Sequence, residues 1–300
     1  MGIGKFIKGK VRTWREDRSL PEPTVSEKES IDILRKDVRL LRTQSAITTD
    51  FWAKKRNELF DKILSSDPRN FTNWEVMYPM FYNPDPCELD ELRRSPYWEQ
   101  FKTALKEDKL GNPAGSPLLS ETSGNLIHHG YSLMRYMLAT GIKPDDLTTI
   151  LEFGGGYGSF CRLAYRMGFK GNYIIFDLPE YSIFQRYFLS GIGLNKPLSV
   201  GRIDDTPGTI SLISEIDHLP QLHSTSLFVG MWSISETPYD LRKKVLARTG
   251  IANSFLLAYQ DNFYGVANGS FFEELAGSFS KGKAISCKIA HMPGNNYLFI

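Results

Sequence analysis

The segment of residues 150–159 constrains the fold of this chain more than any other, because an apolar run leads through a glycine cluster into a helical pattern. It reads Ile-Leu-Glu-Phe-Gly-Gly-Gly-Tyr-Gly-Ser. Glycines adopt positive φ readily and leave the backbone open to close approach by a ligand. A helix that begins directly after such a loop offers unpaired N–H groups and a partial positive charge. The segment therefore predicts a strand, a ligand-binding turn and a helix of a nucleotide-binding sheet.

The chain from Thr148 onward alternates short β-branched or aromatic runs with helical patterns, which is typical of a parallel sheet with crossover helices. The predicted strands are Thr149–Phe153, Asn172–Asp177, Thr209–Ser214, Ser226–Met231 and Ser254–Gln260. The predicted helices are Ser159–Met167, Tyr181–Leu189, Tyr239–Thr249 and Ser270–Phe279. A Pro-Gly turn at residues 293–294 separates the strand-like runs 284–291 and 297–300, which indicates a terminal hairpin. Residues 195–208 fit no regular element and are predicted to form a loop.

The N-terminal half has a different texture. Residues 1–22 form a basic tail, and residues 23–145 carry helical apolar spacing, for example at Ile31, Leu34 and Val38. We predict three regions: the tail, a mainly helical region at 23–145 that serves as a cap, a substrate-binding part or an oligomerisation surface, and a cofactor-binding domain at 146–300. The tail leaves two interpretations open, a solvated segment or a peripheral contact with an anionic membrane surface.

Composition and charge narrow the classes of function. The formal net charge of +2 lacks the marked basic excess of a dedicated nucleic-acid binder, so no nucleic-acid partner is expected. Three cysteines far apart, Cys87, Cys161 and Cys287, show neither metal-site spacing nor a disulfide framework, which favours a reducing cytoplasm. No run approaches the roughly 18 apolar residues of a membrane span. We therefore expect a cytoplasmic protein, with membrane contact limited to the basic tail.

The carboxylate of Glu152, two residues before the first glycine, selects among nucleotide ligands. It would repel a pyrophosphate, and the dinucleotide fingerprint G-x-G-x-x-G fails because Ser159 stands at its third glycine position. S-adenosylmethionine carries an ammonium and a sulfonium but no phosphate, so an acid suits it. Asp177, at the end of the second predicted strand, can accept hydrogen bonds from both ribose hydroxyls. The spacing of Asp177 alone does not separate a methyltransferase from a dehydrogenase.

These motifs resemble those of the class I S-adenosylmethionine-dependent methyltransferase superfamily. The resemblance covers residues 148–300, and it implies an α/β, Rossmann-like seven-stranded sheet of order 3-2-1-4-5-7-6 whose last strand is antiparallel. The combination of the glycine loop, Phe-Asp177-Leu-Pro-Glu and a Ser-Glu pair after the fourth strand is similar to sugar O-methyltransferases of bacterial surface-polysaccharide clusters.

The resemblance also implies roles for single residues. The methionine part of the cofactor would lie against Glu152 and the glycines Gly154, Gly155, Gly156 and Gly158. Its ribose would lie against Asp177 and Leu178, its adenine beside Ser214 and Glu215, and its sulfonium beside Met231 and Trp232.

Methyl transfer to a hydroxyl needs a proton acceptor or a metal at the carboxyl ends of the strands. The candidate catalytic residues are Asp261, Glu236, His129 and His128. Asp261 and Asn262 resemble the magnesium ligands of catechol-type O-methyltransferases, but strand four ends Gly-Met-Trp-Ser without the matching Asp. Mg²⁺ therefore stays an open option, held by Asp261, Asn262 and Glu236.

The function predicted from the sequence is O-methylation of a sugar hydroxyl, with a saccharide, nucleotide-sugar or glycolipid acceptor from polysaccharide or glycoconjugate biosynthesis. The alternatives are a methyltransferase for another small molecule, a nicotinamide-linked enzyme, which Glu152 and Ser159 argue against, and a non-catalytic scaffold that binds the cofactor. Homo-oligomerisation through the helical region is a further option.

Overall fold

The structure is a computed structural model, and it describes residues 20–42, 50–81, 85–194, 196–223, 225–250, 252–280 and 283–300. Most of the predicted basic tail, residues 1–19, lies outside the described residues, so its predicted membrane contact stays a prediction. In the described part of the chain, no helix combines the length and the apolar character that crossing a membrane requires.

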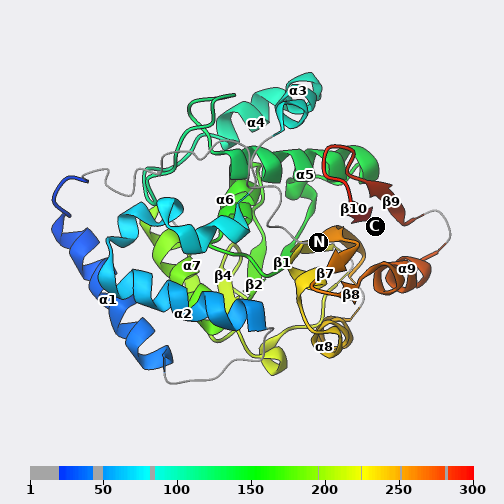
Figure 1. The fold of residues 1–300 in the computed structure, drawn as a ribbon. Helices are drawn as coiled ribbons and strands as arrows, with labels where there is room; N and C mark the ends of the chain where they lie inside the picture. Colours follow the sequence, from blue (N-terminus) through cyan, green and yellow to red (C-terminus); the bar gives the residue numbers. More distant parts are fainter. Residues whose placement is uncertain are drawn as a thin grey trace.

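An eight-stranded sheet with the order β3-β4-β2-β1-β5-β6-β10-β9 forms the centre of the molecule (Figure 1). The strands β1 to β6 run parallel to one another, whereas β10 pairs antiparallel with both β6 and β9. The strand bounds are β1 Thr149–Phe153, β2 Asn172–Phe176, β3 Leu198–Val200, β4 Ile210–Ile213, β5 Ser226–Met231, β6 Ser254–Gln260, β9 Ile285–Lys288 and β10 Asn295–Phe299. A separate small hairpin pairs β7, Asn262–Phe263, with β8, Val266–Ala267.

The predicted α/β, Rossmann-like fold is confirmed. Without the edge strand β3, the sheet has the order β4-β2-β1-β5-β6-β10-β9, which corresponds to the predicted order 3-2-1-4-5-7-6, and β10 is the reversed strand. One difference is the extra edge strand β3, which pairs with β4 and lies within residues predicted as a loop. A three-residue edge strand that follows Pro197 carries almost no alternating pattern, so the sequence offers little signal for it.

Helices cover both faces of the sheet, as expected when successive strand residues are mostly apolar and both faces must be buried. On one face, Ile150, Ile175 and Val229 pack into a core with α5, Gly124–Thr140, α6, Ser159–Arg166, and α7, Pro179–Gly191. On the other face, Leu151 and Phe228 pack into a second core with α8, Tyr239–Thr249, and α9, Gly269–Gly277. Glu152 belongs to the first face, between two apolar neighbours of β1 that face the other way.

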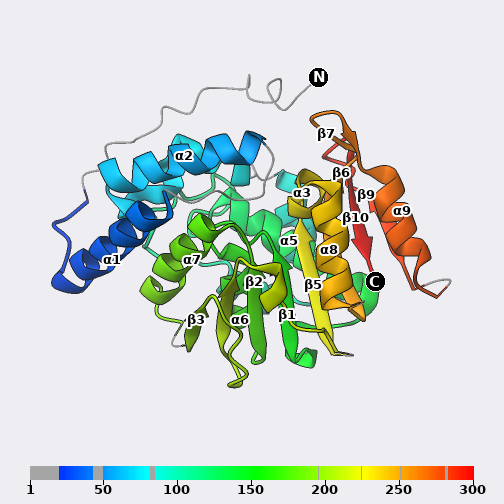
Figure 2. The ribbon, with the colours of Figure 1, turned by 90° about the horizontal axis from the view of Figure 1, so that it is seen from below.

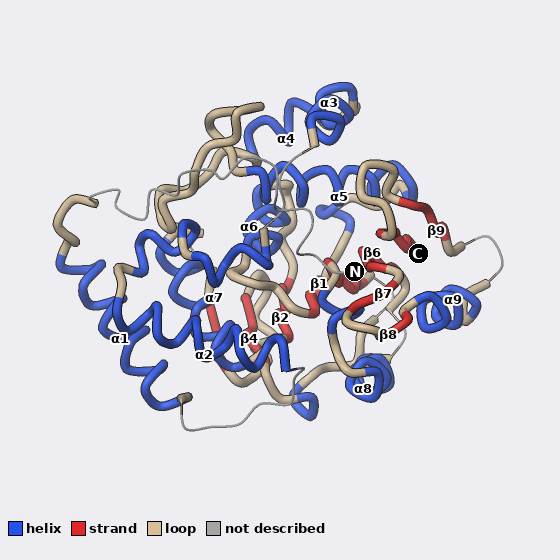
Figure 3. Tube along the Cα trace, in the orientation of Figure 1, coloured by secondary structure: helices blue, strands red, loops and turns tan. Residues whose placement is uncertain are grey.

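The helical N-terminal region packs onto the first of these faces. The tube in Figure 3 shows only helices and loops in the described chain before β1. Its helices are α1 Val25–Leu41, α2 Asp50–Ser65, α3 Pro86–Arg94, α4 Trp98–Ala104 and α5, with the 3-10 helices Pro68–Asn73, Glu75–Met80 and Pro144–Asp146 between them. Helix α1 begins at a capping box of Thr24 and Glu27 and lies along α7 (Figure 2).

One hydrophobic core runs from this region into the sheet, since it includes Leu34 and Phe60 together with Tyr173 and Leu256. A buried ion pair adds a specific contact, because Arg56 Nε of α2 lies 3.1 Å from Glu180 Oε2 of α7. Removing one partner of such a pair leaves a buried charge and costs about 3–5 kcal/mol. The helical region is therefore in a position to contribute side chains to any site at this end of the sheet.

Candidate functional site

A cavity of about 910 Å³ opens at the carboxyl ends of the central parallel strands. Its wall is formed by the segments that follow β1, β2, β4 and β5, together with residues of α2, α5 and α8. Parallel α/β sheets bind ligands at this edge, at the point where the strand order reverses. Here the reversal lies between β1 and β5, which are neighbours in the sheet but distant in sequence.

The glycine loop packs closely against Ser233, which follows the end of β5. Gly154 has φ +73°, and a Cβ added there would lie 2.4 Å from Cβ of Ser233. Gly154, Gly155 and Gly156 all line the cavity. Gly158 does not line it; with φ +95° it is the N-cap residue of α6. Glycine at 154 is thus required both by the backbone conformation and by the lack of space for a side chain.

Glu152 places a carboxylate in the wall of the cavity although it is only 3% exposed. Tyr173 donates a hydrogen bond of 2.8 Å from its hydroxyl to Oε2. Burial raises the pKa of Glu152 to about 8, against the lowering effect of the Tyr173 hydroxyl and with a smaller contribution from the nearby Asp177. Among the described residues, no cationic side chain forms an ion pair with Glu152. The site therefore holds an acid whose ionised form would be stabilised by a positively charged ligand.

Asp177 lies at the end of β2 and also lines the cavity. Its Oδ1 accepts a hydrogen bond from the backbone N of Leu178 at 2.8 Å, and its Oδ2 accepts one from Nε2 of Gln185 at 2.8 Å. Burial raises its pKa to about 7, against the lowering effect of these hydrogen bonds. Leu178 lines the cavity beside it. Both carboxylate oxygens are held in place and retain lone pairs for a ligand's hydroxyl groups.

The far end of the cavity lies beyond β4. Ser214 and Glu215 line it, as do Asp217 and, from α8, Lys244 and Arg248. The remaining predicted cofactor residues, Met231 and Trp232, lie at the end of β5 and also line the cavity. Trp232 has φ +65°, a rare conformation for a bulky residue, and Nε1 donates a 2.6 Å hydrogen bond to Oδ1 of Asn295. Such strain persists only where the surroundings fix it, and it is typical of ligand sites.

Glu236 has the environment of a proton acceptor. It lines the cavity, and its carboxylate accepts hydrogen bonds from Nε1 of Trp52 at 3.1 Å and from Nε2 of Gln260 at 3.2 Å. Burial raises its pKa to about 7, whereas both hydrogen bonds lower it. A general base works best when its pKa lies near the working pH.

His129 lines the cavity, but its neighbour His128 does not. Nδ1 of His129 lies 3.3 Å from Oγ of Ser159. Burial, with a smaller contribution from the adjacent His128, lowers the pKa of His129 to about 3, so the imidazole is neutral at pH 7. His128 is buried on α5, with its ring centroid 5.1 Å from that of Trp232. It therefore contacts the wall of the cavity from behind.

Asp261 and Asn262 do not line the cavity. Asp261 Oδ1 accepts a 2.6 Å hydrogen bond from Nδ2 of Asn296, and Oδ1 of Asn262 accepts one of 3.0 Å from the N of Gly265. Both residues are exposed at the base of the β7–β8 hairpin. Glu236 points its carboxylate to Trp52 and Gln260 instead. The structure thus gives no support for the Mg²⁺ option at Asp261, Asn262 and Glu236.

Several lining residues have no motif of their own in the sequence. Trp52 and Asn125 come from the helical region, and Tyr157 and Tyr181 belong to the predicted cofactor segments without having been singled out. Tyr181 packs edge to face with Trp52, with ring centroids 6.0 Å apart. The helical spacing of apolar residues around Phe51 and Trp52 in the sequence indicates a buried helix face, but it does not indicate which part of the protein that face contacts.

No known protein family and no curated protein matches the sequence. Solved structures that resemble the chain include mitomycin 7-O-methyltransferase MmcR, at 13% identity over 91% of this chain and 93% of that one, with a TM-score of 0.36. Another is a SAM-dependent methyltransferase from Aquifex aeolicus, at 15% identity over 72% and 98%, with a TM-score of 0.38. A third is the arsenic (III) methyltransferase CrArsM from Chlamydomonas reinhardtii, at 15% identity over 53% and 64%, with a TM-score of 0.36. Similarity at this level assigns no function to the chain.

Proposed function

We propose that this chain binds S-adenosylmethionine in the cavity at the end of the sheet and transfers its methyl group. The observation that carries the proposal is Glu152, a nearly buried carboxylate in the cavity wall, directly before a glycine loop that leaves no room for a side chain. A cationic, phosphate-free nucleoside matches this wall, because its ammonium can pair with Glu152 while its ribose hydroxyls donate to Asp177. Ser214 and Glu215 would then lie beside the adenine.

We further propose that the methyl acceptor is a sugar hydroxyl of a saccharide, nucleotide sugar or glycolipid. The cavity of about 910 Å³ is at the upper end of the range of roughly 300–1,000 Å³ for small-molecule sites, so it can hold a second molecule beside a nucleoside. The aromatic rings of Trp52 and Tyr181, which meet edge to face, give this part an apolar wall beside the carboxylate of Glu236. Rings flanked by polar groups suit the apolar face and the hydroxyls of a pyranose.

The residues on the acceptor side can position the hydroxyl and receive its proton. S-adenosylmethionine supplies a methyl group already activated by the positive sulfur. Glu236 would accept the proton of the acceptor hydroxyl as the oxygen forms its bond to the methyl carbon and the bond from that carbon to sulfur breaks, which releases the demethylated cofactor. Gln260 and Trp52 hold the Glu236 carboxylate in a fixed orientation. Neutral His129 can accept a hydrogen bond from a second hydroxyl. Holding the two reacting groups in line supplies much of the acceleration in itself.

Calorimetric titration tests the cofactor assignment. We expect binding of S-adenosylmethionine and of its demethylated product, no binding of NAD, and loss of both interactions in Asp177→Ala. Binding of NAD, or unchanged affinity in the variant, would contradict the assignment. A second assay offers sugars, nucleotide sugars and simple phenols as acceptors. Methylation of phenols alone would leave the cofactor assignment intact and reject the sugar acceptor, and cofactor binding without any turnover would indicate a scaffold.

A further inference from the structure

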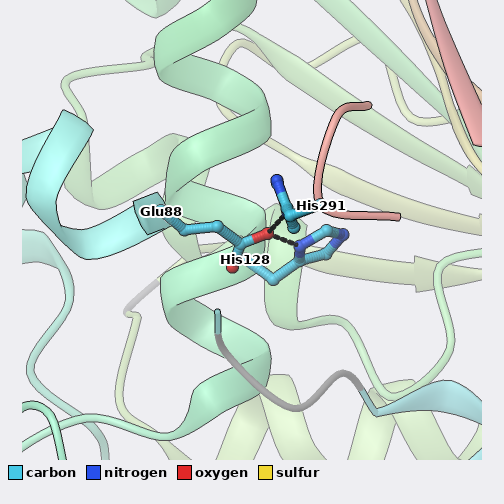
Figure 4. Close-up of side chains that lie close together, drawn as sticks. All are labelled: Glu88, His128 and His291. Carbon is cyan, nitrogen blue, oxygen red and sulfur yellow. Dashed lines mark hydrogen bonds and ion pairs between the residues drawn. The ribbon is translucent and has the colours of Figure 1, made fainter. Parts of the chain in front are cut away.

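A second cluster of functional side chains lies behind the cavity, and none of its members lines the cavity. It consists of Glu88 of α3, His128 of α5 and His291 in the turn between β9 and β10 (Figure 4). Oε1 of Glu88 lies 2.5 Å from Nδ1 of His128 and 2.8 Å from Nε2 of His291. Three segments distant in sequence thus bring three ligand-type groups to one point.

We propose that Glu88, His128 and His291 bind a divalent transition-metal ion of the Zn²⁺ type. Two imidazole nitrogens and one carboxylate oxygen form a common zinc ligand set, which leaves a fourth position for water. The set has too few oxygen ligands for Mg²⁺ or Ca²⁺. The site is separate from the methyl-transfer cavity, and it does not include the residues considered for Mg²⁺ above.

The state of Glu88 points to a ligand beyond the two imidazoles. Its side chain is 1% exposed, and its Oε2 is buried without a hydrogen-bond partner among the described residues. A buried carboxylate oxygen without a partner is costly, by about 1–3 kcal/mol or more when charged. One imidazolium would balance the charge of Glu88, so charge balance alone does not explain a second histidine at the same oxygen. A metal ion uses all three side chains.

The two imidazoles are also held in orientation, as metal ligands usually are. His128 packs on Trp232 with ring centroids 5.1 Å apart, and His291 packs edge to face on Tyr131 at 5.6 Å. Ligand atoms about 2.0–2.2 Å from a tetrahedral zinc lie about 3.4 Å apart, so the present contacts must widen by about 0.6–0.9 Å. His291 is 12% exposed, which gives the ion a route from solvent.

The ion would connect the helical region to the C-terminal hairpin of the sheet, because Glu88 and His128 come from α3 and α5 whereas His291 belongs to the β9–β10 turn. Ligands from distant segments couple metal binding to folding. Metal binding should therefore raise the thermal midpoint of unfolding, whether or not the protein transfers methyl groups.

The test uses the full chain without a polyhistidine tag, treated with a chelator and then dialysed. Titration with Zn²⁺ by calorimetry, and with Co²⁺ by its visible absorption, should show one equivalent bound and a higher unfolding midpoint. Glu88→Gln and His291→Gln should each weaken binding by more than the roughly 10- to 100-fold that loss of an outer-shell partner costs. His223→Gln is the matched control, because His223 is exposed and is not part of the cluster.

If Glu88→Gln fails to fold, His291→Gln still decides the question, since His291 lies in a turn and is partly exposed. Circular dichroism and binding of S-adenosylmethionine show whether each variant is folded. Absence of stoichiometric Zn²⁺ and Co²⁺ binding by the unmodified chain would overturn the proposal and leave a hydrogen-bonded triad. Binding that survives both substitutions would overturn it as well, by placing the metal elsewhere.

Discussion

Replacing Glu152 by Gln tests the electrostatic basis of the proposed cofactor site. The carboxyl has a pKa of about 8 because it is buried, and a cation bound against it favours the ionised form. At pH 7 only about 9% of a group with this pKa is ionised, and at pH 9 about 91% is. The apparent affinity for a cationic ligand scales with the ionised fraction. Binding to the unmodified protein should therefore strengthen as the pH rises from about 6 toward 8, above which the ligand's own ammonium loses its proton.

The informative quantity is the dissociation constant of S-adenosylmethionine for Glu152→Gln divided by that for the unmodified protein. Titration of the ligand's own amino group affects both proteins equally and cancels in this ratio. We expect the ratio to widen about tenfold between pH 7 and pH 9, as the ionised fraction of Glu152 grows. At the higher pH it should approach the roughly 10- to 150-fold that corresponds to a charge-assisted hydrogen bond of about 1.5–3 kcal/mol.

Calorimetry in buffers of different ionisation enthalpy gives a second readout of the same idea. Cation binding at pH 7 should release roughly 0.9 proton from Glu152, and the Gln variant should lose that part of the release. Asp177, with a pKa of about 7, also releases protons on cation binding, and it is present in both proteins. A ratio that does not change with pH, together with equal proton release, would refute the reasoning, because Glu152 would then not face the cationic part of the ligand.

Three further substitutions address the acceptor side and the loop. Glu236→Gln should lower kcat about 10²- to 10⁴-fold while it weakens binding of S-adenosylmethionine far less, and an unchanged kcat would exclude Glu236 as the base. Trp52→Phe removes a donor that lowers the pKa of Glu236, so the acidic limb of the pH–rate profile should move to higher pH; a limb that stays in place would contradict this contact. Gly154→Ala should cost at least about 1–2 kcal/mol in urea unfolding, because alanine must adopt φ +73° and its Cβ meets Ser233. An unaffected midpoint would show that the loop can rearrange.

The central sheet could be predicted closely because its strands are buried on both faces. The observed bounds of β1, β5 and β6 are the predicted ones, since each strand is a largely apolar run with clear signals at both ends. The strand β3 and the β7–β8 hairpin were not predicted, because two- and three-residue strands have no detectable period. Element ends such as Asp177, predicted within β2, differ by one or two residues.

The candidate site was predictable only where the ligand-facing residues follow a strand. Glu152 and Asp177 could be found because strand, loop and helix are contiguous there. Trp52 could not, since it reaches Glu236 from 184 residues away through packing of the helical region. His128 and His129 looked equivalent in the sequence, but neighbours on a helix point about 100° apart. Only His129 can then face the cavity, and His128 faces Glu88.

Three carboxylic acids with raised pKa values, Glu152, Asp177 and Glu236, share one cavity wall. Burial favours their neutral forms, and like charges close together would favour them further. A cationic ligand in this cavity lowers the pKa of all three acids at once, because each anion then has a positive charge nearby. The carboxylate of Glu236, which we propose as the base, would therefore be more fully ionised when the cation is bound. In the proposed reaction, this coupling would favour loss of the acceptor hydroxyl's proton in the presence of the methyl donor, and it requires no movement of the chain.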